Sequence, residues 1–194
     1  MKEQDDIILH FEKEFNLIDY ANKHIVNRHF DHCKFMHSNI GGCVFENCRF
    51  DNCVFESCDL SLIKLKNTGV HKVSILHSKA IGIWWHEAKG PININFEDSK
   101  ISHSCFAGKN LKQNRFINCV AEEVDFSGCN LTKAVFTGTD LQQARFEQTD
   151  LTQADLSGAM NYFIDPLRNK IKKAKFSLPA ALSFLQALDI RLVD

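Results

Sequence analysis

The sequence has little net charge and no long apolar run, and these two absences exclude several classes of protein. Its 194 residues carry 23 Lys and Arg against 24 Asp and Glu, a formal net charge of −1. A near-neutral chain has no global attraction to nucleic acid or to an anionic membrane, so we expect neither as a direct partner. No stretch approaches the roughly 18 apolar residues of a membrane span, and the acidic N-terminus does not fit a signal peptide. We therefore expect a cytoplasmic protein.

The chain also lacks the motifs of common active sites and metal centres. It has no Cys-x-x-Cys pair, no glycine-rich phosphate loop and no elbow-type serine motif. Seven of the eight Cys recur at multiples of five within each half of the chain, and only Cys105 does not. This spacing favours thiols packed in a core over a metal site or disulfides. The nine His are scattered, with His32 and His37 expected at the solvated surface. We expect no enzyme, no cofactor and no metal.

A five-residue period dominates what is present. A core-type side chain recurs at every fifth place from Phe30 to Trp85, and the period resumes from Phe96 to Leu156. Eleven of the sixteen Phe lie on these two runs. A small residue stands two places before each core residue, and Asp or Asn is frequent between them. The five-residue unit therefore consists of a small residue, an Asp or Asn, a Phe or Leu, and two free positions. We predict that the Asp or Asn side chain forms hydrogen bonds where the backbone turns a corner.

Neither a helix nor a strand has this period, but a chain that turns a corner every five residues does. Four units then close one square coil, and coils stack through parallel β-bridges. The sequence thus predicts an all-β solenoid, a right-handed quadrilateral β-helix. Residues twenty apart should stack, which puts Phe116 and Phe136 on one face and Phe106 and Phe126 on the opposite face.

The two runs are out of phase, because Trp85 and Phe96 are eleven residues apart. The Gly-Pro turn signal between them predicts an irregular loop near residues 86–93. Loops on a rigid scaffold often carry binding residues. The candidates for partner contact are Trp84, Trp85, His86, Glu87 and Lys89. One Trp could fill the core while the other covers the irregular coil, or Trp84 could be an exposed contact residue. We favour the first interpretation, because buried Trp is commoner.

The repeat fades after residue 160, so we divide the chain into a repeat domain, 1–160, and a C-terminal module, 161–194. The module should hold one partial coil, an N-cap at Ser177, a helix over 180–188 that forms an α-helical cap, and a short strand over 190–193. It could cap a monomer or join two copies. The candidate dimer residues are Leu182, Leu185, Leu188, Ile190 and Leu192.

Acidic residues outside the Asp/Asn place are candidates for a functional surface. Residues 96–160 carry nine acids and six bases, a local net charge of −3. The acids that the repeat does not require are Glu97, Asp98, Glu122, Glu123 and Glu147.

The repeated unit, carried over about 130 residues, resembles the pentapeptide-repeat family. The C-terminal pattern, with Asn161-Tyr162, Ile164-Asp165 and Lys173-Ala174-Lys175-Phe176-Ser177-Leu178-Pro179, is similar to the topoisomerase-protecting branch. This branch includes the Qnr quinolone-resistance proteins and the albicidin-immunity protein, which the chain resembles most. The resemblance implies a homodimer, joined through the C-terminal helix and strand, that protects DNA gyrase or topoisomerase IV from an inhibitor or toxin.

DNA mimicry in this branch is attributed to a strongly acidic surface, and a net charge of −1 departs from that pattern. Two alternatives therefore stay open: a scaffold for another protein partner, and direct sequestration of an aromatic antibiotic near Trp84 and Trp85.

Overall fold

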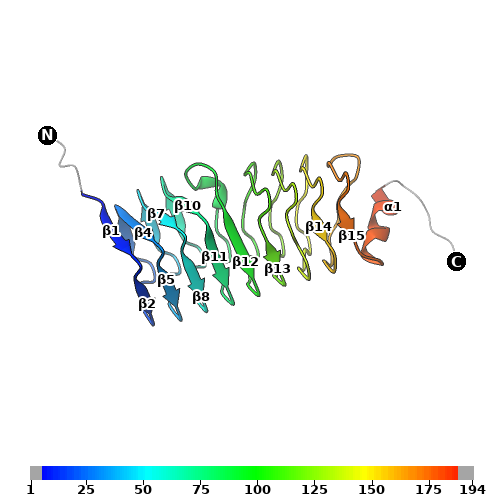
Figure 1. Cartoon of the computed structure of the whole chain (residues 1–194). Coiled ribbons are helices and arrows are strands. Elements are labelled where there is room, and N and C mark those ends of the chain that lie inside the picture. Colours follow the sequence, from blue (N-terminus) through cyan, green and yellow to red (C-terminus); the bar gives the residue numbers. More distant parts are fainter. Residues whose placement is uncertain (1–5, 188–194) are drawn as a thin grey trace.

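The structure, a computed structural model, describes residues 6–187 and is a rod of stacked square coils (Figure 1). Each five-residue unit makes one side of a coil, and four units return the chain to the same side one layer further on. A residue therefore pairs with the residue twenty places later, as in the parallel pair Phe30–Phe50. Parallel pairing sets successive layers about 4.8 Å apart. The right-handed quadrilateral β-helix predicted from the sequence is confirmed.

Four faces run along the rod, named A to D in the order in which the chain visits them. Face A is the sheet of β1 (Ile8–Phe11), β4 (Arg28–Asp31), β7 (Arg49–Asp51) and β10 (Gly69–His71). Face B is the sheet of β2 (Glu14–Asn16), β5 (Lys34–Met36), β8 (Val54–Glu56), β11 (Val73–Leu76), β12 (Ile94–Glu97) and β13 (Phe116–Ile117). Face D begins with β3 (His24–Val26), β6 (Val44–Glu46) and β9 (Lys64–Lys66). Face C, and the later coils of faces A and D, consist of single β-bridges.

Aromatic stacks fill the interior. On face D the ring of Phe126 is parallel to those of Phe106 and Phe146, with centroids 5.5 and 5.3 Å apart. Phe126 also meets Phe116 and Phe136 of face B edge to face, at 5.4 and 5.5 Å. Offset stacks and edge-to-face pairs are the favoured arrangements of aromatic rings. All five rings are buried, as the period predicts.

Seven cysteines occupy the small inward places and are buried, whereas Cys105 lies on the outward side of face D and is half-buried. All eight are free thiols. Desolvation raises the pKa of Cys53, Cys119 and Cys129 to about 12, which keeps them protonated at neutral pH. The cysteines therefore pack as small apolar side chains, and the expectation of core packing is confirmed.

The corners explain the polar part of the repeat. In an Asx turn, the carboxylate of Asp125 accepts a hydrogen bond of 2.8 Å from the backbone N–H two residues on, and Asp155 does the same at 3.0 Å. The second of the two positions that the repeat leaves free is in fact constrained. It has positive φ in coil after coil, as at Asn52 (54°) and Gln143 (55°). Asn, Gly, His and Gln recur there because a left-handed conformation disfavours β-branched residues.

The C-terminal end is closed by aromatic packing. The strand β14 (Asp155–Leu156) pairs with β15 (Lys175–Phe176), and a 3-10 turn η2 (Ala180–Leu182) leads into the helix α1 (Ser183–Ala187). The ring of Phe184 packs edge to face on Phe176 at 4.6 Å, and Tyr162 lies against both. This seal ends the solenoid core.

The start of the helix differs from the prediction. The side chain of Ser177 does not cap it, because the Ser177 hydroxyl accepts a hydrogen bond from the Gly158 N–H of the coil below. The first turn is a 3-10 turn, so the α-helix begins three residues later than expected. Leu188, Ile190 and Leu192 lie outside the described residues.

The central rings should carry much of the stability. We expect Phe126→Ala to lower the free energy of unfolding by about 3–5 kcal/mol, because four surrounding rings leave a cavity that cannot close. Urea unfolding followed by circular dichroism measures this. The control is Val120→Ala, an exposed residue on face C, which should change the free energy by less than about 0.5 kcal/mol. Equal effects of the two substitutions would contradict the packed interior.

Candidate interaction surface

A single register change marks the described coils, and it lies in the coil of residues 84–93. Before it, Val54 pairs with Ser74, twenty residues on. Across it, Ser74 pairs with Asn95 and Trp84 with Cys105, each twenty-one residues on, and after it the spacing returns to twenty. The next large inward residue on face A after Val70 is Ile92, which is buried. Face A has no strand in this coil, so the chain absorbs the extra residue there, between faces D and B.

The two tryptophans of this coil have different environments. Trp85 continues the stack of face D, with its ring parallel to that of Phe106 at 5.8 Å, and is buried. Trp84 is one place earlier, where the repeat points outward, and its side chain is 58% exposed. The interpretation favoured from the sequence, that Trp84 covers the irregular coil, does not match this exposure. The ring of His86 lies 5.7 Å from that of Trp84, so the two form a small aromatic surface on face D.

The segment that follows is anchored from both sides. A 3-10 turn η1 (Trp85–Glu87) ends face D, after which Ala88 turns inward and is buried. The backbone N–H of Lys89 donates to the Thr68 carbonyl of the coil below at 2.8 Å. The side chains of Glu87 and Lys89, and Gly90 and Pro91, are exposed (green in Figure 1).

Lys109 fixes the segment from the other side. It occupies a small inward place of the repeat, where its neighbours along the rod are Ala88 and Cys129. Its ammonium group instead donates to the carbonyls of Ala88 at 2.7 Å and Gly90 at 3.1 Å. Partial burial lowers the pKa of Lys109. A cation between two carbonyls thus holds the loop, a role that its position in the period could have signalled.

A shallow depression of about 570 Å³ lies on face A in front of the loop. Lys89 and Pro91 line it on the loop side, and Gly69 leaves its floor without a side chain. Arg49 and His71 of the preceding coils also line it. The loop, the depression and the Trp84–His86 pair therefore form one continuous surface around the edge between faces D and A, here called the break surface.

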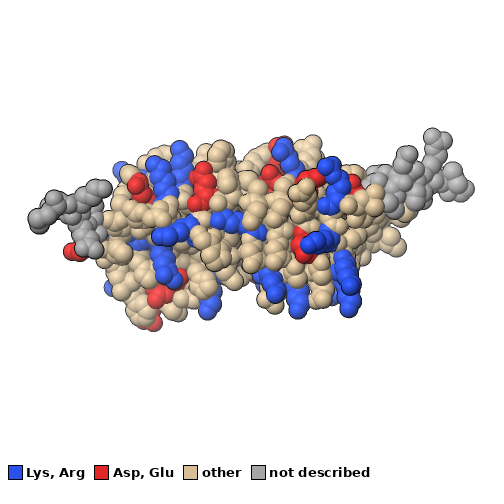
Figure 2. All heavy atoms as spheres, turned by 90° about the horizontal axis from the view of Figure 1, so that it is seen from above, with Lys and Arg blue, Asp and Glu red and all other residues tan. Residues whose placement is uncertain are grey.

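The structure does not bring the five candidate acids together. Glu97 ends the face B strand β12 and Asp98 follows it. Glu122 and Glu123 follow a bridge of face C, and Glu147 lies on face D. Three of these carboxylates have basic neighbours: Asp98 with His77 (3.7 Å), Glu123 with His103 (3.4 Å) and Glu147 with Arg168 (2.6 Å). Figure 2 accordingly shows basic and acidic side chains interspersed on the face viewed from above. Residues twenty-five apart advance by one face, which spreads the acids around the rod.

Sequence reasoning placed Leu182 and Leu185 on an apolar surface near the C-terminal end but missed Phe163, Leu167 and Leu178. Phe163 and Leu167 are 58% and 76% exposed, beside the Asp-Pro break of the repeat. Leu178 is 78% exposed and Leu182 43%, whereas Leu185 is half-buried. The Asp-Pro signal was visible in the sequence, but the side on which the apolar residues emerge was not.

Other kinds of site have no counterpart in residues 6–187. In that range, His, Cys, Asp and Glu side chains nowhere cluster in threes as a metal ion requires. None of the described helices has the length and apolar character needed to cross a bilayer.

A solenoid of stacked square coils belongs to the class of repeat proteins in which each layer contacts only its neighbours. The sequence profile of the pentapeptide repeats matches residues 29–67, 94–132 and 129–160, in 8 copies. These segments cover more than half of the chain, which therefore belongs to the pentapeptide-repeat family.

Solved structures agree on the fold. A trypsin-treated form of QnrB1, a plasmid-mediated fluoroquinolone resistance protein, superposes with a TM-score of 0.67 at 15% sequence identity, over 96% of this chain and 100% of that chain. HetL, a pentapeptide repeat protein involved in heterocyst differentiation regulation from the cyanobacterium Nostoc sp. strain PCC 7120, superposes at 0.62 with 14% identity, over 89% and 88%. Identities this low support the fold and leave function to the site. No curated protein matches the sequence.

Lys109→Met should loosen the loop without unfolding the rod, because it removes the cation that bonds Ala88 and Gly90 and keeps a similar side-chain volume. Hydrogen exchange is the measurement: the amide of Lys89 should exchange at least about tenfold faster, as loss of about 1.4 kcal/mol of local protection implies. Lys112→Met, an exposed lysine of the same coil, is the control and should leave that amide unchanged. Equal exchange rates in both variants would show that Lys109 does not hold the loop.

Proposed function

We propose that this protein binds a type II DNA topoisomerase, DNA gyrase in the first instance, through the break surface and protects it from an inhibitor or toxin. The role is one of binding and not of catalysis. Support comes from the family, from the likeness of the whole rod to a fluoroquinolone resistance protein, and from the C-terminal pattern similar to topoisomerase-protecting members. The single observation that carries the proposal is the exposed Trp84 at the one change of register within residues 6–187.

The exposed Trp84 is the main reason to expect a binding partner at this place. In the coils after Trp84, the residues in register with it along face D are Cys105, Asp125 and Arg145, which are all smaller or more polar. Tryptophan is among the residue types that dominate the energy of protein interfaces. Its neighbours add both charges, from Glu87 and Lys89, and the depression on face A can receive a protruding group. This arrangement fits a protein surface better than a bare phosphate backbone, which would require a basic patch.

Shape and loop contacts are the basis of this recognition, and long-range attraction is a minor part of it. The five candidate acids are spread over three faces and partly neutralised, and so they steer approach only weakly. Binding should consequently weaken little when salt is raised.

The test is a supercoiling assay with purified DNA gyrase and a quinolone or an albicidin-like poison. Trp84→Ala should raise the concentration needed for half-maximal protection roughly thirtyfold, the effect of losing about 2 kcal/mol at an interface centre. The matched control is Phe163→Ala, which removes an equally exposed aromatic ring from a distant coil and should protect as the wild type does.

Wild-type protein that neither binds gyrase nor restores supercoiling in the poisoned reaction would refute the topoisomerase proposal. Protection that survives Trp84→Ala in full would move the contact away from the break surface.

The same proposal includes a homodimer joined through the C-terminal module, where exposed Leu178 and Leu182 lie beside the half-buried Leu185. A two-fold interface uses the same patch on both copies. Sedimentation equilibrium should report a dimer at micromolar concentration, and Leu182→Lys should raise its dissociation constant at least about tenfold, by placing two cations in one apolar contact. Leu62→Lys, at an exposed position far from the module, serves as the control. A wild-type protein that stays monomeric would refute the dimer alone.

A further inference from the structure

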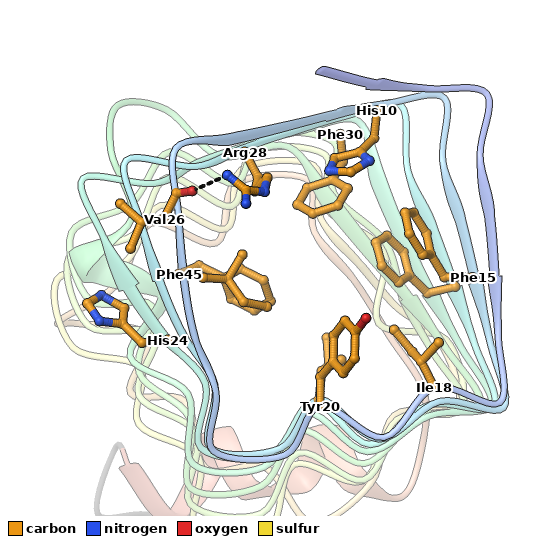
Figure 3. Close-up of a pocket in the computed structure, with 12 residues that line it drawn as sticks. His10, Phe15, Ile18, Tyr20, His24, Val26, Arg28, Phe30 and Phe45 are labelled. Atoms are coloured by element: carbon orange, nitrogen blue, oxygen red, sulfur yellow. Dashed lines mark hydrogen bonds between the residues drawn. The ribbon is translucent and has the colours of Figure 1, made fainter. Parts of the chain in front are cut away.

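The two ends of the described rod differ. At the C-terminal end, Phe184 and its neighbours close the core, but the first coil opens into a hollow of about 280 Å³, here called the N-terminal mouth (Figure 3). Its wall is mainly apolar and aromatic, with Phe15, Ile18 and Phe45 among the lining residues. The volume is near the lower end of the range for small-molecule sites.

Arg28 departs from the repeat at this place. It stands at a small inward position, and the residues at the equivalent positions deeper in the rod are Cys48, Thr68 and Ala88. In Figure 3 its guanidinium lies inside the coil, where Nη1 donates to the carbonyls of Val26 at 2.8 Å and Asn27 at 3.3 Å. These two bonds hold the group by one nitrogen and leave its other donors toward the mouth.

The charge of Arg28 is not balanced locally. Within residues 6–187, the ion pairs of the neighbouring coils join other residues, such as His24 with Glu46 and His29 with Asp51, and none includes Arg28. A half-buried cation in an apolar wall is costly without an anion beside it. Among the described residues, the mouth therefore holds a cation with no ion-paired carboxylate.

Ring faces complete the mouth. His10 is stacked on Phe30 at 4.8 Å, and Phe15 on Phe35 at 4.7 Å, so both rings end their columns with one face uncovered by any described ring. Burial, then the charges of Arg28 and Lys13, lower the pKa of His10, which leaves its ring neutral at pH 7. The hydroxyl of Tyr20 points into the mouth from the side opposite Arg28 (Figure 3).

We propose that the N-terminal mouth is a binding site for a small aromatic carboxylate, with its ring on the open faces of His10 and Phe15 and its carboxylate on Arg28. A planar ring continues the columns of the core with the same stacking geometry. A carboxylate matches the fork of guanidinium donors and supplies the missing charge. This site is separate from the break surface, and the proposal does not depend on topoisomerase binding.

A second copy of the chain fits the mouth less well. Two rods stacked head to head would bring Arg28 of one chain toward Arg28 of the other, across a contact of low dielectric constant. Like charges placed together in this way destabilise an interface. The unbalanced cation thus favours an anionic ligand over self-association.

The experiment uses the full chain and the probe 2-naphthoate, with binding followed by calorimetry and located by NMR shifts. We expect one site per chain, with shifts centred on His10, Phe15 and Tyr20. Arg28→Met should weaken 2-naphthoate binding at least about tenfold, because it removes the charge and keeps the length of the side chain. Arg115→Met, an exposed arginine of face B, is the control and should bind as the wild type does.

Two further probes separate the parts of the site. The neutral 2-naphthylmethanol and the non-aromatic cyclohexanecarboxylate should each bind the wild type at least about tenfold more weakly than 2-naphthoate, since each lacks one of the two contacts. No binding of 2-naphthoate at millimolar concentration, or equal binding to Arg28→Met, would overturn the proposal. So would hydrogen-exchange protection of β1 and β2 that builds up with protein concentration, because a second copy would then cover the mouth.

Discussion

The contact between inward side chains twenty residues apart is the interaction on which the rest of this structure depends. Each coil is too short to bury its own core residues, so Phe126 is covered only because Phe106 and Phe146 lie in the layers on either side. Backbone pairing and ring stacking share this period, and neither can shift without the other. The Asx turns and left-handed corners follow from it, since a square coil must turn after every fifth residue.

The same constraint determines where a binding surface can arise. In regular coils the neighbouring layers fix the backbone path, so no outward segment can protrude. The acids that were candidates for one patch are spread over three faces. Where the register changes, between Trp84 and Phe96, the chain leaves the strand path. Ile92 and Ala88 keep the core filled there, and Lys109 holds the exposed backbone. The loop is thus a fixed feature of a rigid rod, as a recognition surface requires.

The ends of a solenoid pose a separate problem, because the last layer on each side has no neighbour. At one end Tyr162, Phe176 and Phe184 seal the core through a change of secondary structure. At the other end the seal is absent from residues 6–187, and a guanidinium stands where the repeat needs a small side chain. The two ends of the rod therefore differ in structure, and they can bind different partners.

The sequence by itself determined the solenoid, the stacking of its Phe residues, the burial of seven cysteines and the corner role of Asp and Asn. A strict period leaves one geometry that buries all the core positions. The period already placed Trp85 inward, but only the tertiary structure decided that Trp84 is exposed, because the exposure of an outward side chain depends on the layers beside it. It also decided that Ser177 bonds Gly158 instead of capping a helix, and that Arg28 faces an open mouth. These outcomes depend on contacts between layers, and a five-residue period in one chain does not specify contacts at its breaks and ends.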